Sequence, residues 1–419
     1  MRILWLKTEL LHPVDKGGRI RTYQMLRALS RDHEITYLSL DDCTGPAEAT
    51  TLAMEYCSEL LTVPFHPPPP RSARFYSALA RNLVSRLPYP IARYRSPAFS
   101  ARLARLLAER DFEVVVCDFL FSTVNLVPLP SSPSVLFQHN VEAEIWRRRM
   151  EVANGGIRRA YFTSQWRRME KFEAVACRQF DVIAAVSESD AAHFRDRYGV
   201  SDVVTIPTGV DTEYFRPDET FFREEKHIVF TGSMDWMPNQ DGITFFVEQV
   251  MPRLRQRLGK VRLTVVGRSP TPHLLALAER DGDIVVTGRV PDVRPYLNRA
   301  TAAVVPLRVG GGTRLKIYEA MAMECPVVST TIGAEGLPLT PGEHLLIADD
   351  PEALSAACAS MLLDRGRAKA IADRAAEHVR QQGWQAAALG LKSACERAIR
   401  RALHRKGERT VRRVNPSHP

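Results

Sequence analysis

The chain repeats one pattern along most of its length: a short apolar run, then a segment long enough for a helix. The runs occupy residues 2–6, 35–40, 114–118, 135–138, 182–186 and 203–206 in the first half, and 227–231, 262–266, 284–287, 302–306 and 326–330 in the second. Short apolar strands that alternate with helices form β-α-β units, and these units build parallel sheets. The pattern predicts an α/β protein.

The pattern breaks in the segment PTGVDTEYFRP, residues 207–217, and then starts again. A chain of 419 residues is too long for one core, so the break divides it into two domains of similar size. We expect an N-terminal domain over 1–210 and a second domain over 211–385. A helix over 386–403 is expected to return to the first domain, and 404–419 to form a basic disordered tail.

Composition narrows the possible functions. A content of 45% hydrophobic and 25% charged residues is typical of a globular protein. The net charge of +9 comes from two arginine-rich stretches, 71–110 and 397–413, and the rest of the chain is not basic, so no nucleic-acid partner is expected. The seven cysteines form no C-x-x-C pair, which predicts neither a zinc site nor disulfides and favours the cytoplasm. No apolar run is long enough to predict a transmembrane helix.

The first arginine-rich stretch, 71–110, alternates arginines with apolar residues and holds nine arginines against one glutamate. Two interpretations remain open. The arginines belong to a solvated helical face and cover apolar surface with their stems, or the stretch makes a peripheral contact with an anionic membrane.

Glycines follow several strands of the second half: Gly232, Gly267, Gly288 and the triplet 310–312. Ligands of parallel sheets bind beyond the carboxyl ends of the strands, where glycine lets the backbone approach. The repeated glycines therefore predict a ligand cleft at this edge.

The segment 304–331, VVPLRVGGGTRLKIYEAMAMECPVVSTT, carries the densest set of candidate residues. We expect a strand, a glycine loop and a helix over 313–323 with Thr313 as its N-cap. Arg314 and Lys316 place two cations in the first helical turn, where the helix itself prefers acids, and this favours an anionic ligand such as a phosphate. Glu319 could accept two ribose hydroxyls. The alternatives are a solvated Lys316–Glu319 pair and an exposed glutamate.

This segment resembles the signature of retaining glycosyltransferases of the GT4 type, in which a glycine-rich loop precedes a helix ending in E-A-M-A, followed by P-V-V. Further motifs agree with that family in order and spacing: DKGG at 15–18, His139 after a strand, VSE at 186–188, IPTGVD at 206–211, VVG at 265–267 and TGRV at 287–290. The segments QHNVEAEIW and RIRTYQMLRAL are similar to a bacterial subgroup associated with exopolysaccharide synthesis.

The resemblance implies the GT-B architecture, two Rossmann-like domains with a nucleotide-sugar in the cleft. Glu319 would then hold the ribose, with Arg289 and Val290 beside the base. His139 would contact the donor sugar near the reacting carbon. Glycines and one threonine would approach the donor sugar or its diphosphate, namely Gly17 and Gly18 from the first domain, and Gly232, Gly311, Gly312 and Thr313 from the second.

The chain departs from the family's motif at two places. Gly311 stands where the fuller motif has a second glutamate, eight positions before Glu319. The segment from Gly232 to Trp236 has no cation, although many members place an arginine and a lysine there. We expect Arg314 and Lys316 to take over the stabilisation of the leaving diphosphate.

The expected function is retaining transfer of a hexose from a nucleoside diphosphate sugar, of UDP or GDP type, to a saccharide or lipid-linked saccharide acceptor. Cell-surface polysaccharide synthesis is the expected setting. No metal or other cofactor is expected, and the pairs Asp41-Asp42 and Asp349-Asp350 are interpreted as turn or cap residues. A nucleotide-sugar epimerase and a non-catalytic sugar-nucleotide-binding subunit remain alternatives. Glu142 is interpreted either as part of a polar cluster with His139 or as an exposed helix residue.

Overall fold

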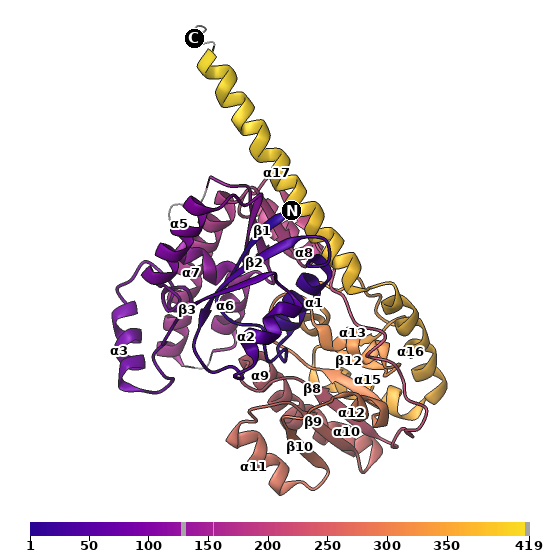
Figure 1. Ribbon diagram of the computed structural model, residues 1–419. Helices are drawn as coiled ribbons and strands as arrows, with labels where there is room; N and C mark the ends of the chain where they lie inside the picture. Colours follow the sequence, from indigo (N-terminus) through magenta and orange to yellow (C-terminus); the bar gives the residue numbers. More distant parts are fainter. Residues whose placement is uncertain (127–130, 154, 415–419) are drawn as a thin grey trace. The chain divides into compact units, whose positions relative to one another are not determined.

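The computed structural model describes residues 1–126, 131–153 and 155–414, with side chains to residue 405. The chain forms two compact units (Figure 1). Unit 1 comprises Met1–Pro207 and Gln385–Pro419, and unit 2 comprises Thr208–Trp384. The division falls at the start of the segment 207–217, where the strand pattern restarts.

Unit 1 contains a seven-stranded parallel sheet in the order β3-β2-β1-β4-β5-β6-β7. Its strands are β1 (Arg2–Lys7), β2 (Glu34–Asp41), β3 (Glu59–Pro64), β4 (Val114–Asp118), β5 (Ser134–Gln138), β6 (Val182–Ala185) and β7 (Val203–Thr205). The central strands are buried along their whole length, because helices cover both faces of the sheet.

The helices of unit 1 connect these strands. They are α1 (Gly17–Leu29), α2 (Ala49–Leu52), η1 (Ala53–Glu55), α3 (Ala73–Asn82), α4 (Tyr89–Ala92), α5 (Pro97–Glu109), η2 (Leu120–Asn125), α6 (Glu142–Glu151), α7 (Gly156–Gln179) and α8 (Glu188–Asp196). Serine side chains cap the N-termini of α3, α5 and α8, each accepting a hydrogen bond from a backbone N–H three residues on.

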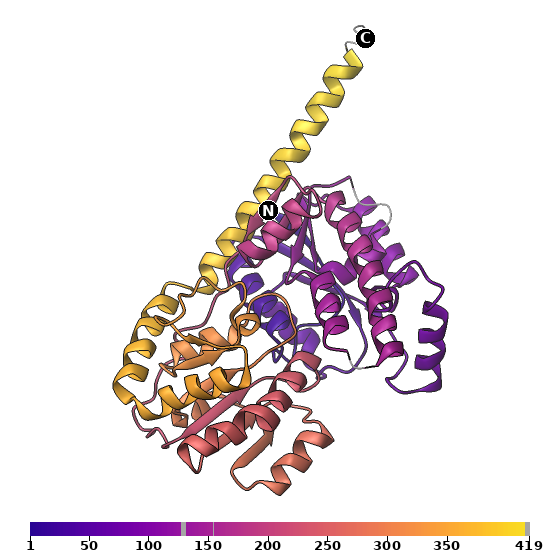
Figure 2. The same cartoon turned by 180° about the vertical axis from the view of Figure 1, so that it is seen from behind.

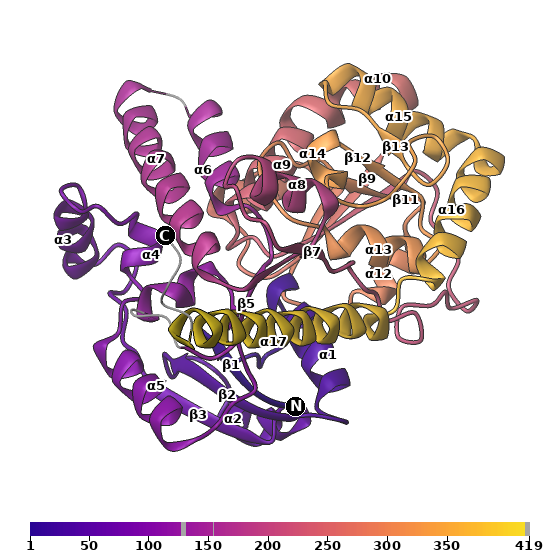
Figure 3. The same cartoon turned by 90° about the horizontal axis from the view of Figure 1, so that it is seen from above.

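Helix α17 (Trp384–Val414) begins at the last residue of unit 2 and belongs to unit 1 from its second residue onward. Figures 2 and 3 show it as one continuous helix along the unit 1 sheet and past it. The expected disordered tail is therefore wrong for residues 404–414, whose backbone is helical, and 415–419 lie outside the described residues. The helix continues because its sequence holds no proline and one glycine between Ser393 and Val414.

Several arginines of the second arginine-rich stretch, 397–413, lie on α17 and form ion pairs with aspartates of unit 1. Arg397 Nε lies 2.6 Å from Asp202 Oδ1, Arg401 Nη1 lies 2.7 Å from Asp202 Oδ2, and Arg405 pairs with Asp181. Both aspartates are buried. These arginines recur every four residues, so one face of α17 attaches the helix to unit 1.

Unit 2 contains a six-stranded parallel sheet in the order β10-β9-β8-β11-β12-β13. Its strands are β8 (His227–Thr231), β9 (Arg262–Val266), β10 (Ile284–Gly288), β11 (Ala302–Val305), β12 (Val327–Ser329) and β13 (Leu346–Ile347). Its helices are α9 (Met237–Phe245), the π-helical η3 (Phe246–Val250), α10 (Met251–Leu258), α11 (Pro272–Arg280), α12 (Arg294–Arg299), α13 (Leu315–Ala322), α14 (Thr331–Ala334), α15 (Pro351–Leu363) and α16 (Arg365–Arg380).

Side chains of the unit 2 strands alternate between two apolar cores. On β8, Ile228 and Phe230 join a core with α10 and α15, whereas Val229 joins a second core with α13 and α16. Successive residues of a strand point to opposite faces, so both faces of this sheet are covered by helices. The structure thus has two parallel α/β sheets, one in each unit, as the resemblance implied.

The segment 237–258 is not one regular helix. It forms α9, η3 and α10 in succession. Pro252 has no N–H for a helical hydrogen bond and crowds the preceding turn, and the backbone before it widens into a π-helical turn.

Among the described residues, no helix combines the length and the apolar character needed to cross a membrane.

Candidate active site

The carboxyl edge of the unit 2 sheet is lined by closely packed glycine backbone. Gly232 N donates to Val266 O at 2.8 Å, and a Cβ on Gly267 would lie only 1.8 Å from Gly232 O. No other residue fits at position 267, because backbone atoms fill the space that a side chain would need. The glycines therefore let the ends of β8 and β9 approach each other at the predicted ligand edge.

Helix α13 follows the glycine loop but starts later than predicted. It spans Leu315–Ala322, and Arg314, not Thr313, occupies its N-cap position without a side-chain capping bond. The Thr313 hydroxyl instead contacts that of Thr208. The cap prediction for Thr313 is wrong because this hydroxyl ties the loop to the start of unit 2.

Arg314 folds back onto the glycine loop. Its Nη1 donates to the carbonyl of Gly311, and its guanidinium lies 5.2 Å from the centre of the Trp236 ring. The side chain is buried, and a Cβ on Gly310 would lie 2.3 Å from its Nη2. Arg314 thus shapes the loop that holds Gly311 and Gly312.

Lys316 points to the end of β8, the place where the sequence lacks a cation. Its Nζ donates to Asn239 Oδ1 at 3.0 Å and lies 4.3 Å from the centre of the Phe230 ring. A Cβ on Gly232 would lie 2.5 Å from the same Nζ. Asn239 is itself fixed, because its Nδ2 donates to Ser233 O at 2.8 Å. A lysine from α13 therefore supplies the cation that the loop after Gly232 does not.

Glu319 lies on the same helix, three residues after Lys316, and is half-buried. Burial lowers the pKa of Lys316 to about 7, with Arg314 adding to the effect and Glu319 opposing it. Burial raises the pKa of Glu319 to about 7, with Lys316 opposing. The solvated surface pair does not fit this environment, since both groups are shielded enough to change their proton affinity.

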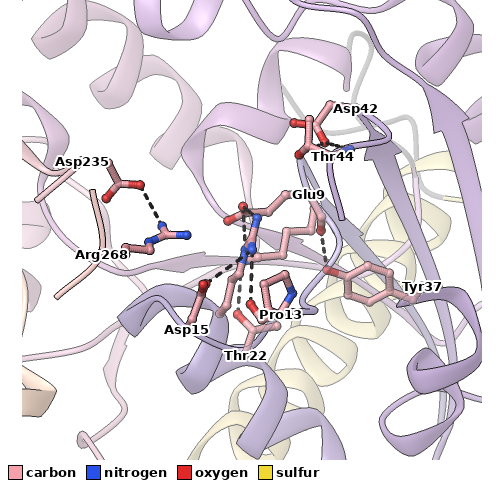
Figure 4. A network of polar contacts seen from close by, with 11 residues as sticks. Glu9, Pro13, Asp15, Thr22, Tyr37, Asp42, Thr44, Asp235 and Arg268 are labelled. Atoms are coloured by element: carbon pink, nitrogen blue, oxygen red, sulfur yellow. Dashed lines mark hydrogen bonds and ion pairs between the residues drawn. The ribbon is translucent and has the colours of Figure 1, made fainter. Parts of the chain in front are cut away.

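Arg268 is a further cation at this edge that the sequence analysis missed. It directly follows the quoted motif ending in Gly267. Its Nε donates to Ser233 Oγ at 2.8 Å and its Nη2 to Asp235 Oδ2 at 2.7 Å, and Figure 4 shows the Asp235 contact. The sequence signal that could have identified Arg268 is a cation immediately after the glycine at the end of a strand.

Arg289 and Val290 follow β10 directly. Gly288, the last residue of β10, has a φ of 70°, a backbone conformation that favours glycine, and it turns the chain at this point. Val290 packs against the core around α13, and Arg289 is exposed. Both residues therefore lie at the carboxyl edge of the same sheet as Lys316 and Glu319.

The candidate residues of unit 1 also lie at a strand edge. Gly17 and Gly18 form the first turn of α1, and Lys16 occupies its N-cap position. His139 follows β5, and its Nδ1 would lie 3.3 Å from a Cβ on Gly18. The structure thus brings Gly18 and His139 together, although they are far apart in the sequence.

The loop that leads into α1 is held by polar contacts (Figure 4). Arg19 donates to Glu9 Oε2 from both Nε (2.8 Å) and Nη2 (2.6 Å), and from Nη1 to Pro13 O at 3.2 Å. The Tyr37 hydroxyl donates to Glu9 O at 2.9 Å. The same arginine lies 3.7 Å from Asp15. These contacts fix the approach to Gly17 and Gly18.

His139 contacts a buried carboxylate that the sequence analysis did not single out. Its Nε2 lies 2.8 Å from Asp118 Oδ1, and Lys7 Nζ lies at the same distance from that oxygen. Lys7 and Asp118 are the last residues of β1 and β4. Polar residues at the ends of predicted strands were the signal that could have revealed them.

Glu142 is not an exposed helix residue. It lies buried in the first turn of α6, and burial raises its pKa to about 7, with Arg149 and Asn140 opposing. Glu173 of α7 is nearby and accepts hydrogen bonds from the backbone N–H groups of Glu142 (2.9 Å) and Ala143 (3.0 Å). A carboxylate thus caps the helix that follows His139.

The two aspartate pairs occupy turns and caps, as predicted. Asp41 accepts from Cys43 N, and Asp42 from Thr44 N and Oγ1 (Figure 4). Asp350 caps α15, and Asp349 accepts from the backbone N–H and hydroxyl of Thr331.

Comparisons with known proteins agree with this architecture. Residues 16–214 match the family model "Glycosyltransferase Family 4", and residues 225–364 match "Glycosyl transferases group 1". The chain is 20% identical over 359 residues to a 44.6 kDa protein in the cps region of Klebsiella pneumoniae, covering 83% of this chain and 88% of that protein.

Two mannosyltransferases are also similar. The lipopolysaccharide core biosynthesis mannosyltransferase LpcC of Rhizobium leguminosarum bv. viciae is 28% identical over 223 residues, which is 48% of this chain and 60% of LpcC. The phosphatidyl-myo-inositol mannosyltransferase of Mycobacterium leprae is 26% identical over 308 residues, 70% of this chain and 75% of the relative.

Solved structures share the fold. A sucrose-phosphate synthase from Thermosynechococcus elongatus superposes with a TM-score of 0.70 at 18% identity, covering 94% of this chain and 98% of the other. HepE of Anabaena, solved with UDP and glucose, superposes with a TM-score of 0.67 at 12% identity, covering 94% and 98%. With the two family matches and the mannosyltransferase relatives, these findings identify the chain as a glycosyltransferase of the GT4 type with the GT-B fold.

Proposed function

We propose that the protein transfers a hexose, with retention of configuration, from a nucleoside diphosphate sugar to a saccharide or lipid-linked saccharide acceptor. The observation that carries this proposal is the position of Lys316 and Glu319. They lie on one short helix behind a glycine loop, at the carboxyl edge of a parallel sheet. An ammonium suits a diphosphate, and a carboxylate suits a ribose diol.

In this proposal unit 2 binds the nucleotide. Glu319 accepts the ribose hydroxyls, Arg289 and Val290 flank the base, and Lys316 meets the diphosphate. The backbone around Gly311 and Gly312, shaped by Arg314, approaches the diphosphate or the sugar. As the glycosidic bond breaks, the leaving diphosphate gains negative charge, and Lys316 stabilises it more in the transition state than in the ground state.

In unit 1, His139 and Gly18 form the surface proposed to meet the donor sugar, with Gly17 beside them. The acceptor hydroxyl attacks on the face from which the diphosphate leaves, as the family resemblance implies. The leaving phosphate then takes the hydroxyl proton.

The names of the relatives guide the choice of donor. Mannosyltransferases recur among them, and one from Mycobacterium tuberculosis is described as GDP-mannose-dependent. HepE was solved with UDP-glucose. A relative in a cps region and one in lipopolysaccharide core synthesis support a role in cell-surface polysaccharide synthesis.

A donor panel tests the proposal. GDP-mannose, UDP-glucose and the free nucleoside diphosphates are titrated against the protein by calorimetry. The donor that binds is then incubated with saccharide and lipid-linked saccharide acceptors, and the anomeric configuration of the product is read by NMR. A product of inverted configuration contradicts retention. Donor isomerisation without acceptor indicates an epimerase, and tight binding without turnover indicates a non-catalytic subunit.

We further propose that the region around α3 contacts an anionic membrane. Within the basic stretch 71–110, the exposed large apolar side chains lie in 71–86, whereas α5 packs its apolar face into the unit 1 core. Tyr76, Leu83 and Val84 are 58%, 64% and 92% exposed there. Four arginines surround them: Arg71, Arg74, Arg81 and Arg86. Exposed apolar side chains among cations suit a lipid surface with anionic headgroups.

Co-sedimentation with vesicles of phosphatidylcholine and phosphatidylglycerol measures this contact. We expect binding that weakens as the salt concentration rises. The double variant Leu83→Ser/Val84→Ser should bind more weakly, and vesicles of phosphatidylcholine alone should not bind the protein. Equal recovery of wild type and variant with the anionic vesicles would contradict the proposal and leave a solvated helical face.

A further inference from the structure

Unit 1 holds a buried charge cluster at the carboxyl ends of β1 and β4. Its centre is Asp118, whose side chain is fully buried. Oδ1 lies 2.8 Å from Lys7 Nζ and 2.8 Å from His139 Nε2. Oδ2 accepts hydrogen bonds from the Thr22 hydroxyl at 2.6 Å and from Trp5 Nε1 at 3.2 Å. Lys7, the Thr22 hydroxyl and Trp5 all approach Asp118 as donors, so the cluster matches an ionised Asp118.

The cluster decides which nitrogen of His139 carries the proton. Burial alone would raise the pKa of Asp118, but Lys7 and His139 hold it below its usual range. The contact between Nε2 and Oδ1 does not have the geometry of a straight hydrogen bond, and the carboxylate acts on the ring nitrogen electrostatically. A bare lone pair on Nε2 would face a carboxylate oxygen at 2.8 Å and be repelled. The proton therefore belongs on Nε2.

The cluster also decides the charge of His139. Burial lowers the pKa of His139, Asp118 raises it, and Lys7 and Arg21 lower it again. Lys7 already balances the charge of Asp118, so a second cation on His139 would have no counter-ion of its own. The rings of Phe119 and Phe137 lie 5.3 Å and 4.6 Å from the imidazole and shield it from water.

The second nitrogen of His139 faces a place where a ligand can approach. Nδ1 would lie 3.3 Å from a Cβ on Gly18, and Gly18 is exposed in the first turn of α1. Any larger residue at this position would press on Nδ1. In a neutral imidazole protonated at Nε2, Nδ1 carries a lone pair and accepts hydrogen bonds.

We propose that Lys7 and Asp118 are positioning residues that hold His139 as a neutral imidazole with its proton on Nε2, so that Nδ1 accepts a hydrogen bond from a hydroxyl group of the ligand. Lys7 acts as an internal counter-ion that prevents Asp118 from charging the histidine. His139 then recognises a sugar hydroxyl, and it does not donate to a phosphate. That the hydroxyl belongs to the donor sugar rests on the proposed function.

NMR of the full-length protein with ¹³C-labelled histidine tests the protonation directly, without any substrate. The Cε1 resonance followed against pH gives the pKa, and the Cδ2 shift reports which nitrogen is protonated. The His139→Asn variant assigns the signals among the 11 histidines. For wild type we expect a neutral ring protonated at Nε2 at pH 7, because burial lowers the pKa of His139. A charged ring at pH 7, or a proton on Nδ1, would overturn the proposal.

The Lys7→Met variant tests the counter-ion. With the ammonium removed, Asp118 has only His139 to balance it, and the pKa of His139 should rise by about 1–3 pH units. The double variant Lys7→Met/Asp118→Asn removes both charges and should return the pKa close to the wild-type value. An unchanged pKa in Lys7→Met would overturn the role of Lys7. If Lys7→Met does not fold, the wild-type titration still decides the protonation state.

Addition of the nucleotide sugar to the labelled wild type connects the result to function. We expect the Cδ2 signal of His139 to shift while the ring stays neutral, and a ring that becomes charged on binding would overturn its role as acceptor. A protein that binds no nucleotide sugar contradicts the proposed function instead, and the result for the free protein is unaffected.

Discussion

At the scale of single residues, the cation beside the end of β8 comes from a helix and not from the loop that follows the strand. The loop after Gly232 contains no cation, yet Lys316 from α13 places its ammonium beside that loop, against Asn239 and Phe230. The side chain reaches this place because position 232 is a glycine. A sequence motif that specifies a lysine in the loop after β8 does not detect a lysine that reaches the same place from α13.

Replacing Glu319 tests its assignment to the ribose. Glu319→Ala should weaken binding of the nucleoside diphosphate by roughly 2–4 kcal/mol, because hydrogen bonds to a charged group contribute about 1.5–3 kcal/mol each. Calorimetry measures the affinity, and circular dichroism checks the fold. Glu343→Ala, at an exposed position of the same unit, is the control. Equal affinities of the two variants would exclude Glu319 from the ribose site.

Lys316 should make donor binding depend on pH. Burial lowers its pKa to about 7, and an anion beside it raises the pKa again. The ammonium form binds the diphosphate, so the contribution of Lys316 to the affinity should be greatest below about pH 7. It should fall by up to about tenfold per pH unit above that value. Lys316→Met should bind more weakly at pH 6 and lose this slope.

Calorimetry from pH 6 to 9 measures this dependence. Because burial also raises the pKa of Glu319 to about 7, its ionisation acts in the opposite sense over the same range. The Glu319→Gln variant therefore isolates the contribution of Lys316. A slope that persists in Lys316→Met would assign the titration to another group.

At the scale of secondary structure elements, α6 depends on a buried carboxylate from α7. Both oxygens of Glu173 accept hydrogen bonds: Oε1 from Glu142 N and Gln138 Nε2, and Oε2 from Ala143 N and the Tyr198 hydroxyl. Burial raises the pKa of Glu173 to about 8, with the two backbone N–H groups opposing. The four donors and the helix N-terminus act against this rise in pKa, because they stabilise the ionised form.

Glu173→Gln should therefore destabilise unit 1, because the amide NH₂ would face two of these donors. We expect a loss of about 1–3 kcal/mol in the free energy of unfolding, measured with urea. Glu170→Gln, on the more accessible side of the same helix, should change it little. Equal stabilities of the two variants would mean that the contacts of Glu173 contribute nothing measurable.

At the scale of the whole molecule, α17 connects distant parts of the chain. It leaves unit 2 at Trp384 and binds unit 1 through arginines that face Asp202 and Asp181. The first part of the arginine-rich stretch 397–413 thus attaches α17 to unit 1.

The double variant Arg397→Ala/Arg401→Ala should loosen this attachment, because it leaves the buried Asp202 without both cations. We expect a destabilisation of about 1–3 kcal/mol, less than for a fully buried pair because the arginines are partly exposed. Limited proteolysis should cut α17 faster than in wild type. Arg400→Ala, at an exposed position of the same helix, is the control, and identical cleavage rates in both variants would contradict the attachment.

The sequence by itself determined most of the strands (all except β3 and β13), the two α/β units and the glycine-lined edge, because these follow from short-range patterns of apolar residues and glycines. It also brought Lys316 and Glu319 together, since residues three positions apart lie on one helix face. Their assignment to a donor remains a prediction.

Only the tertiary structure decided where side chains point and what surrounds them. Lys7 lies more than a hundred residues before Asp118 and His139 in the sequence, and the parallel packing of β1, β4 and β5 brings the three residues into contact. Burial of Glu142 and the turning of Lys316 toward β8 likewise depend on neighbours far along the chain. The physical reason is that local patterns fix backbone conformation, whereas the charge state and direction of a side chain depend on long-range packing, which removes water and supplies partners.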